Sequence, residues 1–170
     1  HSDYNDRFII SGILHEILKV YQENCSNLRR VNIHYCNLEN GGDEALAMTI
    51  RSCTHLTRIS LYRCNVADEQ LLPIVEAVRG HTALERLDLA SNRISATGCQ
   101  AIASLLEDPN SNVLFLDLEQ NRINFDGAVT LFNSLSSNSR LRNIQLRENP
   151  FDNREDSPRI MNALDRLLCN

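Results

Sequence analysis

The 170-residue sequence has no tryptophan, and aromatic residues make up only 5% of it. No apolar run approaches the ~18 residues of a transmembrane helix, and no secretory leader is visible. Positive charge is also in deficit, because 17 Lys and Arg face 22 Asp and Glu and leave a net charge of -5. This balance argues against nucleic-acid and membrane partners. We therefore predict a cytoplasmic protein.

Catalytic and metal-binding signatures are missing as well. The sequence has no G-x-S-x-G, GxxxxGK or H-E-x-x-H motif, no CxxC pair and no close Cys/His cluster. The five histidines occupy unrelated positions or predicted loops, where we expect them to be solvated. We accordingly predict a non-catalytic protein that has no catalytic residue, no metal site and no cofactor.

One pattern occupies most of the chain. The segment LERLDLASNRI, residues 84–94, follows the spacing L-x-x-L-x-L-x-x-N/C-x-L of a leucine-rich repeat. The alternation of Leu87 and Leu89 predicts a short strand with one buried face. Further copies begin at Leu28, Leu56, Val113 and Leu141, so successive starts are 28 or 29 residues apart. Five copies in phase predict a solenoid in which each repeat contacts its neighbours.

A second pattern follows each of the first four strands. Apolar residues 18 and 22 positions after each start lie one helical turn apart and predict a helix. The fold class is therefore α/β: a right-handed leucine-rich-repeat horseshoe with short parallel strands on its concave face and helices on its convex face. We expect one domain over residues 1–170, with an N-terminal capping helix in 1–27, repeats from 28, 56, 84, 113 and 141, and a C-terminal capping helix in 152–170. Because the sequence begins at His1, we expect a fragment of a longer protein.

The six cysteines admit two interpretations. Cys36 and Cys64 occupy the N/C position of the repeat, and Cys25 and Cys53 are also one repeat apart. Reduced thiols in a cytosolic protein are the favoured interpretation. A disulfide between Cys25 and Cys53 is the alternative.

Repeats of this length with a full helix resemble the ribonuclease-inhibitor-like subfamily of leucine-rich repeats. The segments SNRISATGCQAIASLL (91–106) and QNRINFDGAVTLFNSL (120–135) carry the resemblance most clearly, and it covers residues 28–151. Similar repeats occur in NOD-like receptors, the Ran GTPase-activating protein and tropomodulin. The resemblance implies a scaffold, and function must come from the residues that the scaffold displays.

The displayed residues form columns across the concave face. One column holds Arg30, Arg58, Arg86, Phe115 and Asn143, and the next holds Asn32, Ser60, Asp88, Asp117 and Gln145. Arginines stacked about 4.8 Å apart repel one another unless an anion faces them. One alternative is that the arginines are solvated or neutralised by Glu85, Asp88 and neighbouring acids, and the other is an acidic partner. We expect Asp88 and Asp117 to lie on an open wall without a dry pocket that could shift a pKa.

Tyrosine and arginine are frequent among interface hot spots, and the sequence places both in the N-terminal half of the arc. The predicted partner-binding residues are Arg30, His34, Tyr35, Arg58, Tyr62, Arg63, Arg86, Asp88, Phe115 and Asp117. The predicted function is a monomeric protein-interaction scaffold, part of a larger receptor, adaptor or regulatory protein, that binds another protein with an acidic, partly apolar segment. The alternative, implied by the resemblance to the Ran activator, is a regulator of a small GTPase. Actin-filament capping is a third hypothesis.

Overall fold

The computed structural model describes residues 16, 18 and 27–152, and strands alternate with helices along this part of the chain. The strands are β1 (Arg30–Asn32), β2 (Arg58–Ser60), β3 (Arg86–Asp88), β4 (Phe115–Asp117) and β5 (Asn143–Gln145). The helices are α2 (Gly42–Ser52), α3 (Asp68–Arg79), α4 (Ala96–Glu107) and α5 (Phe125–Leu135), followed by a 3₁₀ turn, η2 (Pro150–Asp152). The predicted α/β leucine-rich-repeat solenoid is confirmed.

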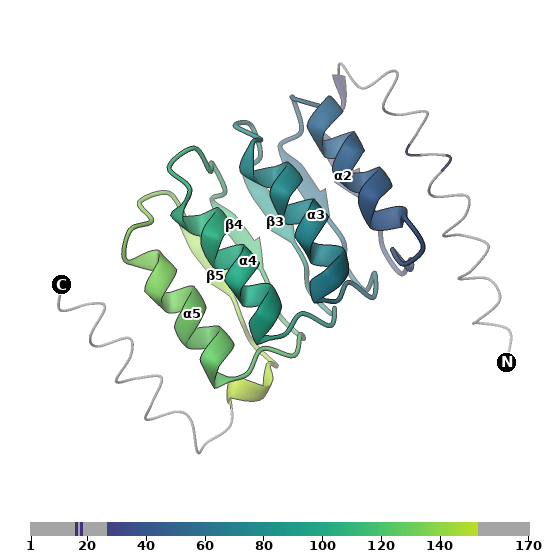
Figure 1. The fold of residues 1–170 in the computed structure, drawn as a ribbon. Coiled ribbons are helices and arrows are strands. Elements are labelled where there is room, and N and C mark those ends of the chain that lie inside the picture. Colours follow the sequence, from purple (N-terminus) through teal and green to yellow (C-terminus); the bar gives the residue numbers. More distant parts are fainter. Residues whose placement is uncertain (1–15, 17, 19–26, 153–170) are drawn as a thin grey trace, which may run out of the picture.

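The five strands form one parallel sheet in the order β1-β2-β3-β4-β5. Figure 1 shows helices α2 to α5 in a row in front of this sheet, each beside its neighbour in sequence. The middle residue of each of the first four strands points into the core between the two layers: Val31, Ile59, Leu87 and Leu116 are all buried. The flanking residues of each strand are therefore on the opposite face, which we call the strand face.

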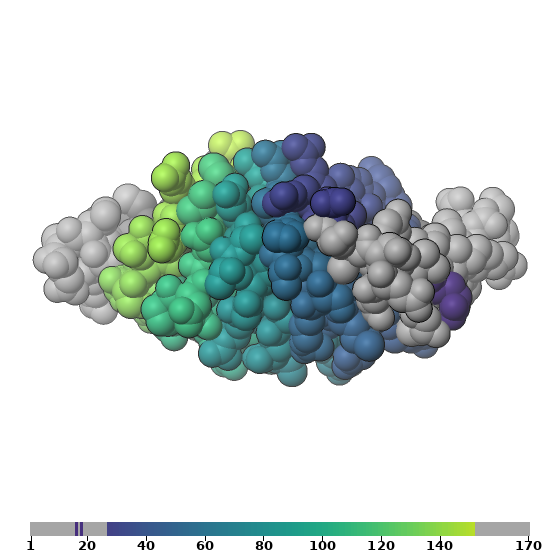
Figure 2. All heavy atoms as spheres, turned by 90° about the horizontal axis from the view of Figure 1, so that it is seen from above, coloured from purple at the N-terminus to yellow at the C-terminus, as the bar shows by residue number. Residues whose placement is uncertain are grey.

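Apolar residues of the helices complete the core at the predicted positions. Leu46, Ile74, Ile102 and Leu131 are fully buried, each on a different helix. Figure 2 shows the sequence colours succeeding one another along the length of the molecule. The buried apolar residues of all the described repeats form one cluster. Within the described residues, no helix combines the length and apolar character needed to span a bilayer.

A buried asparagine binds neighbouring repeats together behind each later strand. Asn92 Oδ1 accepts hydrogen bonds from the backbone N–H groups of Cys64 (3.1 Å) and Val66 (3.0 Å). Its Nδ2 donates to the carbonyls of Leu61 (2.8 Å) and Leu89 (2.9 Å). Because buried backbone groups need partners, this single side chain satisfies four of them.

Asn121 and Asn149 occupy the same position in the next repeats and make the corresponding bonds, for example to the N–H groups of Ile94 and Ile123 at 3.0 Å. Cys64 replaces asparagine in the second repeat, and its Sγ donates to the carbonyl of Ile33 at 2.9 Å. Cysteine at this position therefore keeps the donor but offers no amide oxygen to accept from the backbone.

The structure tests the prediction of reduced thiols for only some of the cysteines. Cys36, Cys64 and Cys99 are free thiols. Burial raises the pKa of Cys64 and of Cys99 to about 12, which leaves both as unreactive neutral thiols. Cys25 lies outside the described residues, so the bridge to Cys53 stays an untested alternative.

The two predicted capping helices fall almost wholly outside the described residues. Glu16 and Leu18 are helical, and Leu18 is buried against the first repeat. The hydroxyl of Thr49 on α2 donates to the carbonyl of Leu18 at 3.4 Å. The C-terminal cap predicted in 152–170 is described only at its first residue, at the end of η2.

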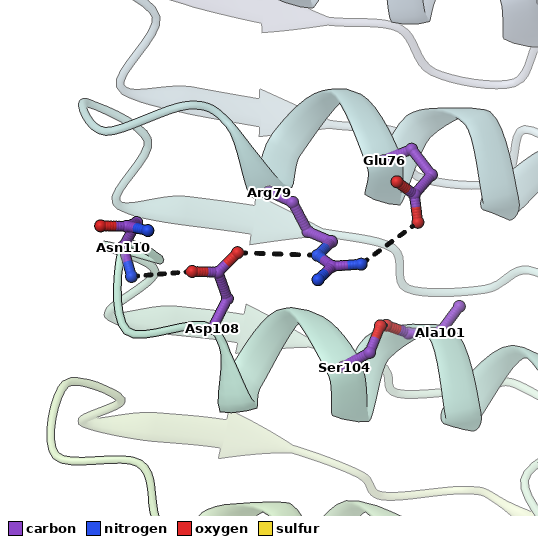
Figure 3. A network of polar contacts seen from close by, with 6 residues as sticks. All are labelled: Glu76, Arg79, Ala101, Ser104, Asp108 and Asn110. Carbon is purple, nitrogen blue, oxygen red and sulfur yellow. Dashed lines mark hydrogen bonds and ion pairs between the residues drawn. The ribbon is translucent and has the colours of Figure 1, made fainter.

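On the helix side, α3 is joined to the loop that follows α4. Figure 3 shows Arg79 between Glu76 and Asp108, with nitrogen–oxygen distances of 3.5 and 3.6 Å. Asp108 also accepts from the backbone N–H of Asn110 at 2.8 Å and so shapes the return loop to β4. The Arg79–Glu76 pair is largely exposed, and such pairs contribute about 1 kcal/mol or less to stability.

One expectation about the histidines is wrong. His81 is only 6% exposed, and its Nε2 donates to the carbonyl of Cys53 at 2.9 Å. Its Nδ1 has no hydrogen-bond partner among the described residues. His81 precedes Leu84 by three residues, as Cys53 precedes Leu56, so its repeat position could have indicated a structural role.

Candidate functional site

The arginine column lies on the strand face as predicted. Arg30 is directly opposite Arg58, and Arg58 is directly opposite Arg86, across the parallel pairs β1–β2 and β2–β3. All three side chains are exposed. Among residues 16, 18 and 27–152, no carboxylate forms an ion pair with any of them. Direct pairing with Glu85 or Asp88 is therefore not seen, and both the solvated alternative and the acidic-partner alternative stay predictions.

These arginines line one shallow depression, which we call the arginine hollow. Its walls are Arg30, Asn32, His34, Arg58, Ile59, Ser60, Arg86 and Asp88, and its volume is about 260 Å³. Three arginines and one aspartate line the hollow, so their formal charges sum to +2, not counting His34. Its surface is rich in hydrogen-bond donors and suited to an anion.

A chain of hydrogen bonds crosses the hollow and occupies its only carboxylate. Ser60 Oγ donates to Asp88 Oδ2 at 2.6 Å, and His34 Nε2 lies 2.9 Å from Ser60 Oγ. Because the serine proton is committed to Asp88, His34 Nε2 must be the donor in its contact with Ser60. Asp88 Oδ1 accepts from the backbone N–H of Ala90 at 3.0 Å. Both oxygens of Asp88 therefore accept a hydrogen bond from within the repeats, which fixes the orientation of this carboxylate.

Aromatic side chains gather beside the hollow in what we call the tyrosine cluster, formed by Tyr35, Tyr62 and Arg63. The two tyrosine rings meet edge to face with centroids 5.6 Å apart. The Arg63 guanidinium lies 5.8 Å from the ring centre of Tyr35 and 5.4 Å from that of Tyr62. His34 joins the edge of the cluster, 6.0 Å from Tyr62. The cluster connects with the arginine hollow through His34.

The backbone holds the tyrosine cluster in place. Tyr35 and Arg63 have φ angles of +58° and +55°, in the left-handed region that favours glycine. The N–H of Tyr35 donates to the carbonyl of Tyr62 at 3.0 Å, and the N–H of Arg63 donates to that of Ala90 at 3.2 Å. These bonds stabilise the turn after each strand and fix where the two side chains leave the sheet. Tyr35 is 53% exposed there.

A second hollow of about 280 Å³ lies over β3, β4 and β5 and contains the remaining predicted residues. Asp88 and Asp117 face one another across β3 and β4, and the Arg86 guanidinium stacks 4.5 Å from the ring centre of Phe115. Burial raises the pKa of Asp117, and the charges of Asp88 and Glu119 raise it further. The expectation that the open wall could not shift a pKa is therefore wrong for Asp117.

The structure brings the ten predicted residues together on the strand face and its rim, in two groups. Eight of them belong to the arginine hollow or the tyrosine cluster, and Phe115 and Asp117 belong to the second hollow, which shares Arg86 and Asp88 with the first. Asn32 and Ser60 also line the arginine hollow but were not predicted site residues. Their columns were visible in the sequence, whereas the engagement of Asp88 by Ser60 depends on side-chain geometry.

No group of three or more His, Cys, Asp or Glu side chains among the described residues is arranged to hold a metal ion.

Comparison with known proteins identifies the repeat but not a function. A family model described as a leucine-rich repeat matches residues 80–103. The comparison with curated protein sequences gives no match. The fold is similar to a solved structure of leiomodin-1 actin-binding site 2, with 19% identity, coverage of 90% of this chain and 88% of that one, and a TM-score of 0.68.

It is also similar to the tropomodulin C-terminal domain of Caenorhabditis elegans, with 17% identity, coverage of 91% and 93%, and a TM-score of 0.62. At such identities the likeness establishes a shared leucine-rich-repeat fold. Because one fold carries many functions, the role of this chain must be argued from its own surface.

Proposed function

We propose that this chain is a non-catalytic protein-interaction scaffold that binds a partner protein on its strand face. The arginine hollow and the tyrosine cluster form the binding surface, and the partner contributes an acidic, partly apolar segment. The observation that carries the proposal is the in-register column of Arg30, Arg58 and Arg86, which is exposed and forms no ion pair within the described residues. The whole 170-residue chain acts as one monomeric repeat domain in this proposal.

Electrostatic repulsion explains why such a column favours an acidic partner. Neighbouring strands of a sheet lie about 4.8 Å apart, so the three guanidinium groups start from closely spaced backbone positions. An incoming carboxylate relieves their repulsion and gains charge-assisted hydrogen bonds. The rim offers complementary apolar contact, because Tyr35 and Tyr62 present ring surface beside the positive charge.

The tyrosine cluster is also suited to carry binding energy. Tyrosine and arginine are enriched among the few residues that dominate interface energetics. Tyr35 is prepositioned by its turn, so a partner meets a surface that is already ordered and pays less conformational entropy on binding. A partner segment with acidic residues over the arginine hollow and an apolar residue against Tyr62 would contact both the hollow and the tyrosine cluster.

The test is a double substitution that removes one group from each part. Arg58→Ala combined with Tyr62→Ala removes a central guanidinium and the ring that contacts both His34 and Tyr35. We expect the variant to fold, since Arg58 is exposed and Tyr62 is only half-buried, and to lose most partner recovery in affinity capture from a native lysate. A control with Arg140→Ala, an exposed residue between α5 and β5, should bind as the unmodified chain does. Equal recovery by all three proteins would exclude this surface.

Actin is a specific candidate partner, because the solved structure of leiomodin-1 that this fold resembles is titled an actin-binding site. Support comes from the extent of the likeness, which covers 90% of this chain. Co-sedimentation with actin filaments and a monomer-binding assay address this candidate. Regulation of a small GTPase is the alternative function, and acceleration of GTP hydrolysis in a panel of small GTPases would favour it over a passive scaffold.

A further inference from the structure

We infer that the arginine hollow recognises a phosphorylated side chain, phosphoserine or phosphothreonine, on the partner segment. This inference rests on the proposed function and names the chemistry that its acidic segment brings to the hollow. It is carried by the charge of the hollow, the spacing of its donors and the state of its one carboxylate.

The charge of the hollow matches a phosphomonoester better than a single carboxylate. With three arginines and one aspartate, the formal charges of the hollow sum to +2, not counting His34. A phosphorylated serine carries about -1.5 to -2 at neutral pH, whereas Asp or Glu carries one negative charge. One phosphoryl group can therefore neutralise the hollow, and two separate acidic side chains would be needed for the same effect.

The spacing of the arginine donors also favours a phosphoryl group over a carboxylate. Arg30, Arg58 and Arg86 project from adjacent strands about 4.8 Å apart. A carboxylate pairs with one guanidinium through its two oxygens, but a phosphoryl group has three terminal oxygens and can accept from two guanidinium groups together. Asn32 also lines the hollow, and its side-chain amide offers a further hydrogen-bond donor.

The one carboxylate of the hollow is outnumbered and held in place. Asp88 repels an anion, but three arginines line the same hollow, and the two oxygens of Asp88 accept from Ser60 and from the backbone of Ala90. These bonds fix the position of the carboxylate. His34 is oriented by the same chain, with Nε2 directed at Ser60, and lies at the boundary between the hollow and the tyrosine cluster.

The experiment compares three sets of short peptides with randomised flanks and a central phosphoserine, glutamate or serine. Binding to the 170-residue chain is measured by fluorescence polarisation. We expect the phosphoserine set to bind at least about tenfold more tightly than the glutamate set, a difference of about 1.4 kcal/mol. The serine set should bind more weakly than both.

Matched variants locate the binding. Arg58→Gln keeps a long polar side chain but removes the central charge, and we expect it to weaken phosphoserine binding about tenfold or more. Arg140→Gln removes one positive charge elsewhere and should change binding less than about twofold. Thermal melts followed by circular dichroism confirm that both variants are folded.

The outcomes separate this inference from the function on which it rests. Equal binding of the glutamate and phosphoserine sets would overturn phosphoryl recognition and leave the acidic-segment scaffold intact. Unchanged phosphoserine binding by Arg58→Gln would place the phosphoryl group elsewhere and also overturn the inference. Inorganic phosphate that binds as tightly as the phosphopeptides would show a simple ion site, with the same consequence. Failure of the Arg58/Tyr62 variant to reduce partner capture would instead contradict the proposed function.

Discussion

Replacing Asn92 with alanine tests whether the buried asparagine holds adjacent repeats together. The substitution leaves the N–H groups of Cys64 and Val66 without their acceptor and the carbonyl of Leu61 without its donor, whereas the carbonyl of Leu89 still accepts from Asn121. A buried polar group that loses its partner costs about 1–3 kcal/mol, so the two N–H groups alone amount to about 2–6 kcal/mol. This loss is a large share of the roughly 5–15 kcal/mol that stabilises a typical protein.

The free energy of unfolding is measured by urea denaturation followed by far-ultraviolet circular dichroism, because the chain has no tryptophan to report by fluorescence. We expect Asn92→Ala to lose about 4 kcal/mol, which corresponds to a fall of about 8–16 °C in Tm for a chain of this size. The slope of free energy against urea should stay the same, since the folded surface is unchanged.

Asn92→Cys is the matched control, because cysteine occupies this position at Cys64. A thiol can donate to a carbonyl, as Cys64 Sγ does to Ile33, but it cannot replace the amide oxygen as an acceptor. We expect Asn92→Cys to lower the free energy of unfolding, but by less than Asn92→Ala does. A loss below about 1 kcal/mol for Asn92→Ala would refute the argument, because the hydrogen bonds of Asn92 would then contribute little to stability. Full recovery by Asn92→Cys would show that the acceptor is not needed.

Two further predictions concern stability. Gly98→Ala would place its Cβ 2.5 Å from Asp68 Oδ1 and 2.7 Å from Ile94 Cγ2, and we expect it to cost about 1–3 kcal/mol. Gly80→Ala is its control in the same urea titration and should be nearly neutral, because nothing lies within 4 Å of the added carbon; equal losses would contradict the packing explanation. The pKa of the Asp117 carboxyl is raised in the folded state, so folding makes its ionisation less favourable. The ionised carboxylate therefore reduces the free energy of unfolding at pH 7. Below about pH 3.9 the carboxyl is protonated in both states and this cost disappears. Asp117→Asn should therefore raise the free energy of unfolding at pH 7 and lose that gain under acid, and a gain that grows under acid would show the sign to be wrong.

The repeat architecture could be predicted because it depends on local periodicity. Leu87 and Leu89 are spaced for one face of a strand, and the helical pairs that follow are spaced for one turn of a helix. Since each repeat packs only on its neighbours, the same short pattern places every strand. The columns of displayed residues follow from the same spacing, and Arg30, Arg58 and Arg86 lie in register as it predicts.

Sequence reasoning was less successful where a residue depends on contacts across repeats. The sequence predicts a solvated histidine at His81, but its ring is buried and reaches the carbonyl of Cys53 in the preceding repeat. The sequence predicts no pKa shift for Asp117, but burial in the second hollow raises its pKa. Both errors concern side-chain environments, which periodicity does not describe.

The sequence by itself determined the solenoid, the order of its strands and the residues that each strand displays, because these depend on spacing along the chain. Only the tertiary structure decided how Asp88 is held beside the arginines. Ser60 and the backbone N–H of Ala90 each donate to one of its two oxygens. The physical reason is that hydrogen bonds of 2.6 and 3.0 Å depend on atomic positions in three dimensions, which a repeat pattern does not specify.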